Sequence, residues 1–363
     1  MQPDCYFWLD GEHGGRFSYI GRGRQAIPDL RRRAEPDPAL PFPFQGGWIG
    51  WFTYEKEPFF IEAERWMAID HLTSQTWSFH FDSRETPQPG GAAGALRFHQ
   101  SKPEYLANIA KCLEAIRAGE SYEICLTNEL RGPCTIDPLA YFETLRQLNP
   151  APYAAFLRTP EIAIACSSPE LFLNVTADGH VTSKPIKGTA PRSSDPGQLA
   201  SDEKTRAENL MIVDLVRNDL GRVCRTGSVK VTGFQQIETF ATVHHMVSTI
   251  EGDLKPGLTA LDCIGAAFPP GSMTGAPKIR TMEIIHRLEA RPRGVYSGCI
   301  GFLSHTGAAT FNVAIRTAVF ANGEVSIGTG GAIVAQSDPE GEWEEINLKA
   351  EPLVRAFRQR SGE

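Results

Sequence analysis

The sequence lacks the features that mark several large classes of protein. No apolar run reaches the ~18 residues that a membrane-spanning helix needs, and the first residues carry neither the basic segment nor the apolar core of a signal peptide. We therefore expect a soluble, cytoplasmic protein that does not bind a membrane. The sequence also contains no Rossmann fingerprint, no P-loop and no internal repeat.

Basic charge and metal-binding cysteine pairs are scarce as well. The net charge is −7, and the one basic block, Arg31-Arg32-Arg33, lies in a segment with Pro and Asp, so we expect no binding to nucleic acid. The 8 cysteines include no Cys-x-x-Cys pair, which is typical of free thiols in a reducing compartment. What remains is 363 residues with 41% hydrophobic content, enough for a sizeable core in one or two domains.

The most informative stretch is Lys184-Pro185-Ile186-Lys187-Gly188-Thr189. Pro185 fixes one backbone dihedral and Gly188 allows a turn or a close approach, so Lys187 is held between two constrained positions. A lysine that loses its solvation there has a lowered pKa and can act as a nucleophile or a base. The alternative is an ordinary solvated loop, the usual setting of a lone lysine.

A second motif, Ser168-Pro169-Glu170, precedes an expected hairpin. Its turn is Ala177-Asp178-Gly179, and its second arm leads back to Lys187, so the hairpin brings Glu170 near that lysine. A carboxylate among apolar neighbours has a raised pKa and can donate a proton at neutral pH. The alternative is an exposed glutamate at the end of a strand.

Periodicity places several other elements. Pro103 opens a helix that Gly119 ends, and a strand is expected over 120–127. A second helix is expected over 202–217, with an apolar stripe of Leu210, Val213 and Val216. Many strand-like runs with turn signals and a handful of helices indicate an α+β protein with large, mainly antiparallel sheets.

Motifs in the second half of the chain are candidates for binding a substrate. Residues 270–278 form a glycine-rich turn that opens a helix at Pro277, and helix N-termini favour anions. Arg316 can hold a carboxylate through two hydrogen bonds, and the backbone N–H groups of 328–332 are expected to form a nest for another. These motifs and the expected strands 242–248, 296–301 and 315–317 supply the candidate residues His245, Thr274, Tyr296, Arg316, Gly330 and Gly331.

Acidic residues on two helices are candidates for a metal site. Glu208 lies on the helix expected over 202–217, and Glu342, Glu345 and Lys349 are spaced i, i+3 and i+7 on one face of the last helix. A few carboxylates that leave room for water and substrate oxygens suit Mg²⁺. By spacing alone, however, such a glutamate pair is more often a solvated helix face.

The order and content of these motifs, from about Trp48 to Lys349, resemble the chorismate-utilising enzymes. Within that family, Lys187 matches the lysine of the branch that makes 4-amino-4-deoxychorismate, whereas anthranilate synthase and isochorismate synthase carry alanine there. Lys184 stands where the isochorismate type carries its acid. The resemblance implies two large antiparallel sheets packed as a sandwich, with helices outside and the site between the sheets.

The resemblance also implies roles. Lys187 is implied as the nucleophile at ring carbon C2 of chorismate, and Glu170 as the general acid/base for the hydroxyl that leaves C4, where ammonia then attacks. Mg²⁺ is the implied cofactor, with Glu208, Glu342 and Glu345 as ligands and Lys349 among the substrate-binding residues. Ammonia is implied to come from a glutamine amidotransferase (glutaminase) subunit, and the product to serve p-aminobenzoate and folate synthesis.

Some interpretations stay open. We expect a β-rich N-terminal portion, residues 1–95, and a catalytic portion, 96–363, integrated into one globular unit. Some family members bind tryptophan in the first portion, but the acidic-Ser pair found there is Asp10-Gly11 in this chain, so packing in the core is the alternative. Another chorismate enzyme, of the anthranilate synthase or isochorismate type, and a non-catalytic binding subunit are the competing functions.

Overall fold

The computed structural model describes residues 4–29, 33–240 and 243–361, so Arg31 and Arg32 of the basic block lie outside the described residues. Nineteen strands form one hydrogen-bonded network, and every strand pairing within the described residues is antiparallel. None of the helices in these ranges is long and apolar enough to cross a membrane. The cytoplasmic location stays a prediction.

The elements follow one another along the chain in three groups. The first is β1 (Cys5–Asp10), β2 (Phe17–Gln25), β3 (Gly47–Phe52), β4 (Pro58–Asp70), β5 (Gln75–Phe79) and β6 (Arg97–Phe98). The second is α1 (Lys102–Arg117), β7 (Glu123–Pro133), α2 (Pro138–Leu148), β8 (Tyr153–Arg158), β9 (Ile162–Ser168), β10 (Leu171–Val175), β11 (His180–Lys184), β12 (Ile186–Pro191), α3 (Pro196–Ser201) and α4 (Glu203–Val223). The third is β13 (Lys230–Thr239), β14 (Val243–Asp253), α5 (Ala260–Ala267), the 3₁₀ turn η1 (Gly271–Met273), β15 (Gly275–Ala276), α6 (Lys278–Glu289), β16 (Cys299–Ser304), β17 (Ala309–Val313), β18 (Thr317–Ala321), β19 (Glu324–Ile333) and α7 (Pro339–Ser361).

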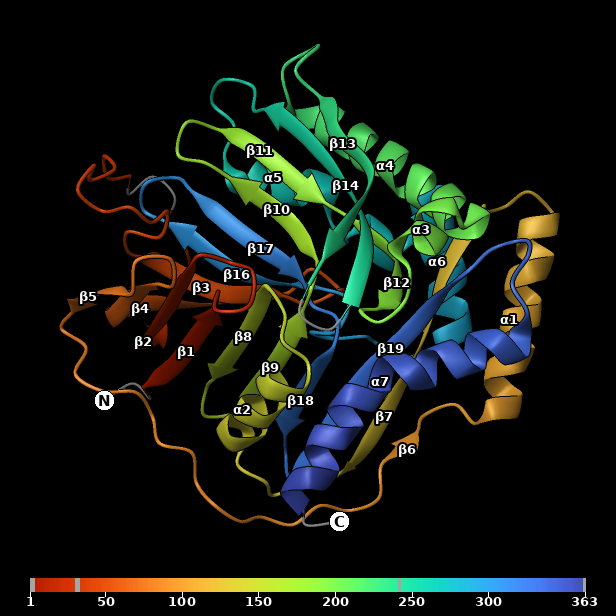
Figure 1. Cartoon of the computed structure of the whole chain (residues 1–363), viewed down its shortest axis with the longest axis horizontal. Helices are drawn as coiled ribbons and strands as arrows, with labels where there is room; N and C mark the ends of the chain where they lie inside the picture. The colour runs from red at the N-terminus through yellow and green to blue at the C-terminus, as the bar shows by residue number, and fades with distance from the viewer. Residues whose placement is uncertain (1–3, 30–32, 241–242, 362–363) are drawn as a thin grey trace.

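The strand network has two halves that meet at β4. One half continues from β4 through β2, β1, β8, β9, β18 and β19 to β7, and the other continues through β3, β16, β17, β10 and β11 to β14 (Figure 1). The first residues of β4 pair with β3 and its remainder pairs with β2, so this one strand belongs to both halves. The predicted arrangement of antiparallel sheets with helices is confirmed, and β4 joins the two sheets into one network.

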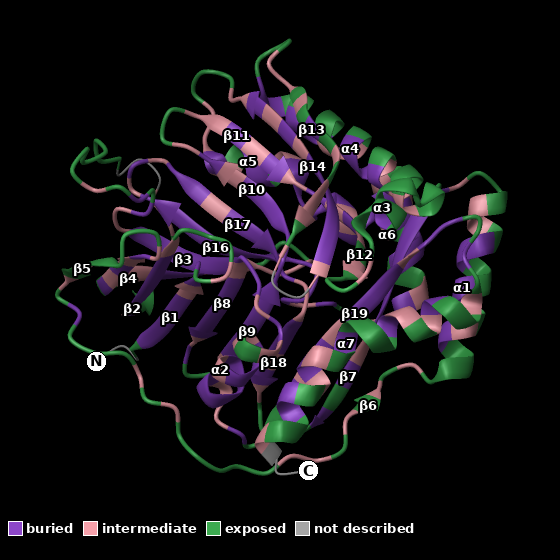
Figure 2. Cartoon of the chain, viewed as in Figure 1, coloured by how far each residue is buried: buried purple, intermediate pink, exposed green. Residues whose placement is uncertain are grey.

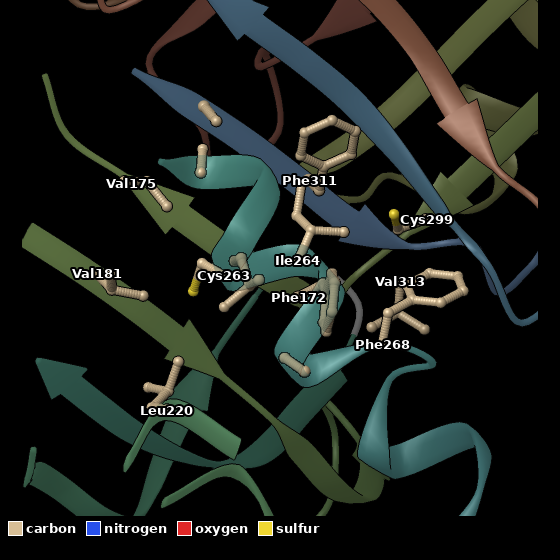
Figure 3. Close-up of a cluster of buried hydrophobic side chains, with 14 of the residues drawn as sticks. Phe172, Val175, Val181, Leu220, Cys263, Ile264, Phe268, Cys299, Phe311 and Val313 are labelled. Atoms are coloured by element: carbon tan, nitrogen blue, oxygen red, sulfur yellow. The ribbon is translucent and has the colours of Figure 1, made fainter. Parts of the chain in front are cut away.

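Apolar side chains fill the space between the halves and the space under the helices. Phe7 and Tyr19 from one half pack in one cluster with Trp51 and Phe302 from the other. Helices α4 and α5 cover the outer face of β10 and β11, as the cluster in Figure 3 shows, while α2 and α7 cover β8, β9, β18 and β19. Figure 2 shows the strands largely buried and the outward faces of the helices exposed. Burial of this apolar surface is the main force that holds the layers together.

Two expected elements differ in detail from the structure. The strand expected over 120–127 begins at Glu123 and runs on to Pro133. Helix α4 extends past the predicted end to Val223, and Leu210 is 54% exposed, so the predicted stripe is wrong there. The buried face of α4 includes Asn209 and Asp219, whose polar side chains hide it from a search for apolar residues.

Candidate active site

Lys187 on β12 is buried between two carboxylates. Its Nζ donates a hydrogen bond of 2.6 Å to Oε1 of Glu123 on β7 and lies 4.0 Å from Oε2 of Glu208 on α4. The next residue, Gly188, has φ +75°, and a Cβ there would lie 2.4 Å from a side-chain carbon of Thr205 on α4. Glycine is therefore required for β12 to pass close to α4, and that approach brings Lys187 to Glu208.

The ionisation of Lys187 differs from the prediction. Burial by itself would lower the pKa of Lys187, but the carboxylates of Glu123 and Glu208 outweigh burial and raise this pKa above its ordinary value. The expected lowered pKa is therefore wrong for this arrangement. Lys187 is an ammonium in this structure and must lose a proton before it can act as a nucleophile.

Glu170 stands directly before β10 and is 5% exposed, which rules out the alternative of an exposed strand-end glutamate. β10 and β11 form the predicted hairpin, with Leu171 opposite Lys184, so the chain returns past Glu170 toward Lys187. Burial raises the pKa of Glu170 to about 7, and the Ser272 hydroxyl and the Lys187 ammonium oppose that shift. Glu170 is thus a carboxyl group that titrates near neutral pH and can both donate and accept a proton.

Two of the three predicted metal ligands, Glu208 and Glu342, lie near Lys204, a lysine that no sequence motif indicated. Nζ of Lys204 lies 3.3 Å from Oε1 of Glu342 and 3.8 Å from Oε1 of Glu208. Glu345, one turn after Glu342 on α7, forms an ion pair of 2.6 Å with Lys349. The structure thus brings the acidic residues of α4 and α7 together, each paired with a lysine.

The carboxylates of Glu208, Glu342 and Glu345, here called the acidic cluster, are of the kind that binds a divalent cation, although lysines now pair with them. No group of three His, Cys, Asp or Glu side chains in the described part of the chain is arranged to hold a metal ion as it stands. Oε2 of Glu342 is nevertheless buried without a hydrogen-bond partner among the described residues. A Cβ at Gly331 would lie 2.9 Å from this oxygen and 3.9 Å from Oε1 of Glu345, so the two carboxylates converge over a glycine.

Arg316 and His245 form the second polar region of the site. Arg316 lies between β17 and β18 with φ +50°, not in a strand as predicted. Its Nη1 donates to Oδ1 of Asn149 at 3.1 Å, and no acidic side chain in the described ranges pairs with it. A half-buried guanidinium without an acid partner is suited to a carboxylate ligand.

His245 on β14 is neutral at physiological pH. Burial, followed by the charge of Arg316, lowers the pKa of His245 to about 4, so the ring adds no positive charge beside the guanidinium. Its Nδ1 lies 2.9 Å from Oγ1 of Thr189. His245 can therefore offer a neutral hydrogen-bonding group next to Arg316.

The remaining predicted binding residues have structural contacts of their own. The Thr274 hydroxyl donates to the carbonyl of Gly271 at 3.1 Å. Tyr296 precedes β16 instead of lying in a strand, and its ring covers Gly328, where a Cβ would lie 2.1 Å from a ring carbon.

The predicted glycine nest is wrong. Gly330 and Gly331 belong to the extended strand β19 and pair with β7, and neither has the positive φ that a nest needs. Lys349 donates a hydrogen bond of 2.9 Å to the carbonyl of Gly330, so β19 contributes a backbone acceptor to the site.

A buried ion pair connects two of the segments that form the site. Arg293 and Glu289 have side chains 1% exposed each and are bonded at 2.7 Å. Arg293 also donates to the carbonyls of Met273 at 2.6 Å and Cys125 at 2.7 Å, which fixes the 270–278 turn to β7. Four residues of the site were not predicted from the sequence: Glu289 and Arg293 of this pair, Glu123 and Lys204. The i, i+4 spacing of Glu289 and Arg293 is the one signal in the sequence that could have indicated any of them.

In the N-terminal portion, the Asp10 carboxylate is paired with other side chains of the chain. The Asp10 carboxylate accepts hydrogen bonds from Arg146 at 2.8 Å and Ser18 at 3.0 Å, and Arg146 lies over the Trp8 ring. This arrangement favours the core-packing interpretation over a tryptophan site.

Known proteins resemble this chain over most of its length. Residues 61–355 match the family described as chorismate binding enzyme. The chain is 42% identical to an aminodeoxychorismate synthase of Streptomyces pristinaespiralis over 91% of this chain and 53% of that protein. It is 37% identical to anthranilate synthase component 1 of Thermus thermophilus over 89% of this chain and 79% of that protein.

A solved structure agrees with these sequence matches. The crystal structure of anthranilate synthase component I from Streptococcus pneumoniae superposes with a TM-score of 0.80 at 29% identity, covering 96% of this chain and 90% of that one. The chain spans about half the length of the two Streptomyces aminodeoxychorismate synthases that it matches. The fold, the order of the motifs and these matches together show that the chain belongs to the chorismate binding enzyme family.

Proposed function

We propose that this chain is the aminating component of an aminodeoxychorismate synthase, which converts chorismate and ammonia to 4-amino-4-deoxychorismate. The observation that carries the proposal is Lys187, a buried lysine that donates a hydrogen bond of 2.6 Å to Glu123. Its positive charge also acts on the pKa of Glu170. Two relatives that are 42% identical to this chain bear the name aminodeoxychorismate synthase, which supports the proposal.

The charges of the site suit chorismate, which carries one carboxylate on its ring and one on its enolpyruvyl ether. Arg316, half-buried and without an acidic partner among the described residues, would bind one carboxylate, with neutral His245 beside it. Glu208, Glu342 and Glu345 would hold Mg²⁺, which when bound neutralises the other carboxylate and withdraws electrons as a Lewis acid.

The proton steps follow from the protonation of the residues. Glu123 takes a proton from the Lys187 ammonium, and the free amine adds at C2 of the ring. Both ring double bonds shift and the C4 hydroxyl leaves as water with a proton from Glu170. Ammonia then attacks C4, both double bonds shift back, and Lys187 leaves C2 as an amine that recovers its proton from Glu123. Glu170, now a carboxylate, accepts the proton that the new amine loses, so the sum is chorismate plus ammonia to product plus water.

Product identity tests the proposal. The purified chain is incubated with chorismate, MgCl₂ and an ammonium salt, and the product is identified by mass. We expect 4-amino-4-deoxychorismate with its enolpyruvyl group retained. Anthranilate with release of pyruvate would instead assign the chain to the anthranilate synthase reaction, and isochorismate to the hydroxylating one.

The nitrogen source gives a prediction. We expect the chain to use ammonium but not glutamine, because a cysteine that hydrolyses glutamine must be accessible and all 8 cysteines are buried. The measurement compares product formation with ammonium and with glutamine, before and after addition of a glutaminase subunit. Rapid glutamine turnover by the chain alone would contradict the prediction.

The metal site gives another prediction. Glu345→Ala is expected to require about ten times more Mg²⁺ for half-maximal activity or to be inactive, because one of three carboxylate ligands is lost. Its fold should persist, since the Glu345 side chain is 40% exposed. Activity is titrated against MgCl₂, with Glu351→Ala on the exposed side of α7 as the matched control. An Mg²⁺ requirement equal to that of the wild type would show that Glu345 is not a ligand.

A further inference from the structure

Lys204, in the first turn of α4, links two proposed metal ligands that come from different helices. Its Nζ approaches Glu342 of α7 to 3.3 Å and Glu208, one turn along α4, to 3.8 Å. The Lys204 ammonium is therefore a cation that these two carboxylates share.

The other lysines of the acidic cluster are held more firmly than Lys204. Lys187 has 9% of its side chain exposed and donates to Glu123 at 2.6 Å. Lys349 is bonded both to Glu345 at 2.6 Å and to the carbonyl of Gly330 at 2.9 Å. Lys204, with 42% of its side chain exposed, is about as exposed as Lys349 at 44%, but Glu342 is its one hydrogen-bond partner in the described part of the chain. A long side chain at the edge of a site can move its charge into water at little cost.

Glu342 is the ligand at which an ammonium and a metal ion would compete. Its Oε1 accepts from Ser337 at 2.5 Å and from Lys204 at 3.3 Å, while its Oε2 is buried with no partner among the described residues. A buried carboxylate with one oxygen unsatisfied is poorly neutralised by Lys204 alone. A divalent cation would bind the unsatisfied oxygen of Glu342. That cation and the Lys204 ammonium, both within ~4 Å of the same carboxylates, would repel each other strongly.

We propose that Lys204 is an internal cation that holds Glu208 and Glu342 together when no metal is bound and moves out to solvent when Mg²⁺ binds. The inference rests on the metal site of the proposed function. It predicts that Lys204 lowers the affinity of the chain for Mg²⁺, since its ion pairs must break first, and that it stabilises the metal-free state by neutralising carboxylates that otherwise repel.

The test measures binding of MgCl₂ by calorimetry to the metal-free chain, without chorismate. Lys204→Met keeps the length of the side chain and removes its charge, and it is expected to bind Mg²⁺ on the order of tenfold more tightly. Lys204→Arg keeps a cation among the carboxylates and is expected to bind no more tightly than the wild type. Arg206→Met is the matched control, because it removes the same charge from the same helix at an exposed residue that bonds to Gln235 instead of a carboxylate. We expect its affinity to stay within about twofold of the wild type.

Thermal unfolding supplies a second readout. Without metal, Lys204→Met is expected to melt at a lower temperature than the wild type, and MgCl₂ is expected to raise its melting temperature by more. Equal Mg²⁺ affinities of the wild type and Lys204→Met, or weaker binding by the variant, would overturn the inference. Failure of the metal site itself is distinguishable, because then the wild type would bind no Mg²⁺, or would bind it equally well after Glu342→Gln.

Discussion

Lys187→Ala is expected to lower the rate of 4-amino-4-deoxychorismate formation by about 1,000-fold or more, because it removes the amine that adds to the ring. Lys187→Arg is expected to fail as well, since a guanidinium stays protonated and cannot attack carbon. Lys187→Gln keeps some bulk but no nucleophile and should resemble alanine. The measurement is the steady-state rate with chorismate, MgCl₂ and ammonium.

The structure adds a stability effect to this series. Glu123 is 0% exposed and Lys187 is its one ion-pair partner among the described residues, so the alanine and glutamine variants leave a buried carboxylate without its partner. They are expected to unfold at lower temperature, whereas Lys187→Arg keeps the charge. The double variant Lys187→Ala with Glu123→Ala removes both charges and serves as the control for folding. An alanine variant that forms the same product at nearly the wild-type rate would reduce Lys187 to electrostatic support.

Glu170→Gln is expected to lower the rate by about 100- to 10,000-fold, the usual contribution of a positioned acid or base. The amide keeps the shape of the side chain but can neither protonate the leaving hydroxyl nor accept the proton of the new amine. Substrate binding should change little, so the loss is expected in kcat more than in KM. Glu129→Gln, on the strand β7, is a matched control remote from the reacting groups. A wild-type kcat in Glu170→Gln would contradict the assigned role.

The pKa of Glu170 also predicts how activity and stability change with pH. Burial raises this pKa to about 7, so the carboxyl is protonated below that pH and activity that needs the acid should fall as pH rises through about 7. For stability, the folded chain holds this proton more tightly than the unfolded chain, whose ordinary pKa is 4.5. The corresponding stability is therefore present below pH 4.5 and is lost as pH rises to about 7. The free energy of unfolding of Glu170→Gln should not fall in this way between pH 4.5 and about 7. Relative to the wild type, the variant should therefore gain stability as pH rises, which unfolding curves at several pH values would measure.

The parts of the site that the sequence predicted are local in the chain. Glu170 and Lys187 are joined by one hairpin, and the register of β10 and β11 follows from a short turn between two strand-like runs. The face shared by Glu342, Glu345 and Lys349 follows from the helical repeat alone. Short-range geometry of this kind can be deduced without knowing the rest of the fold.

The parts that the sequence did not predict depend on contacts between distant segments. Glu123 is 64 residues from Lys187, and their pairing reverses the expected direction of the Lys187 pKa. Lys204 meets Glu342 across 138 residues, and no spacing rule connects them. The glycine-rich segment 328–332 predicts a nest because glycine permits that conformation, but pairing with β7 keeps the segment extended. In each case the deciding contact comes from how β7, β12, α4 and α7 pack together.

The most direct test of the account is to look for chorismate attached to Lys187. The wild-type chain, in excess over chorismate, is mixed with MgCl₂ and a limiting amount of ammonium, quenched in acid during a single turnover, and digested for mass spectrometry. The account predicts that the peptide containing Lys187 gains the mass of chorismate less one water, and that the Lys187→Arg variant shows no such gain. An unmodified Lys187 peptide throughout a turnover that yields 4-amino-4-deoxychorismate would contradict it.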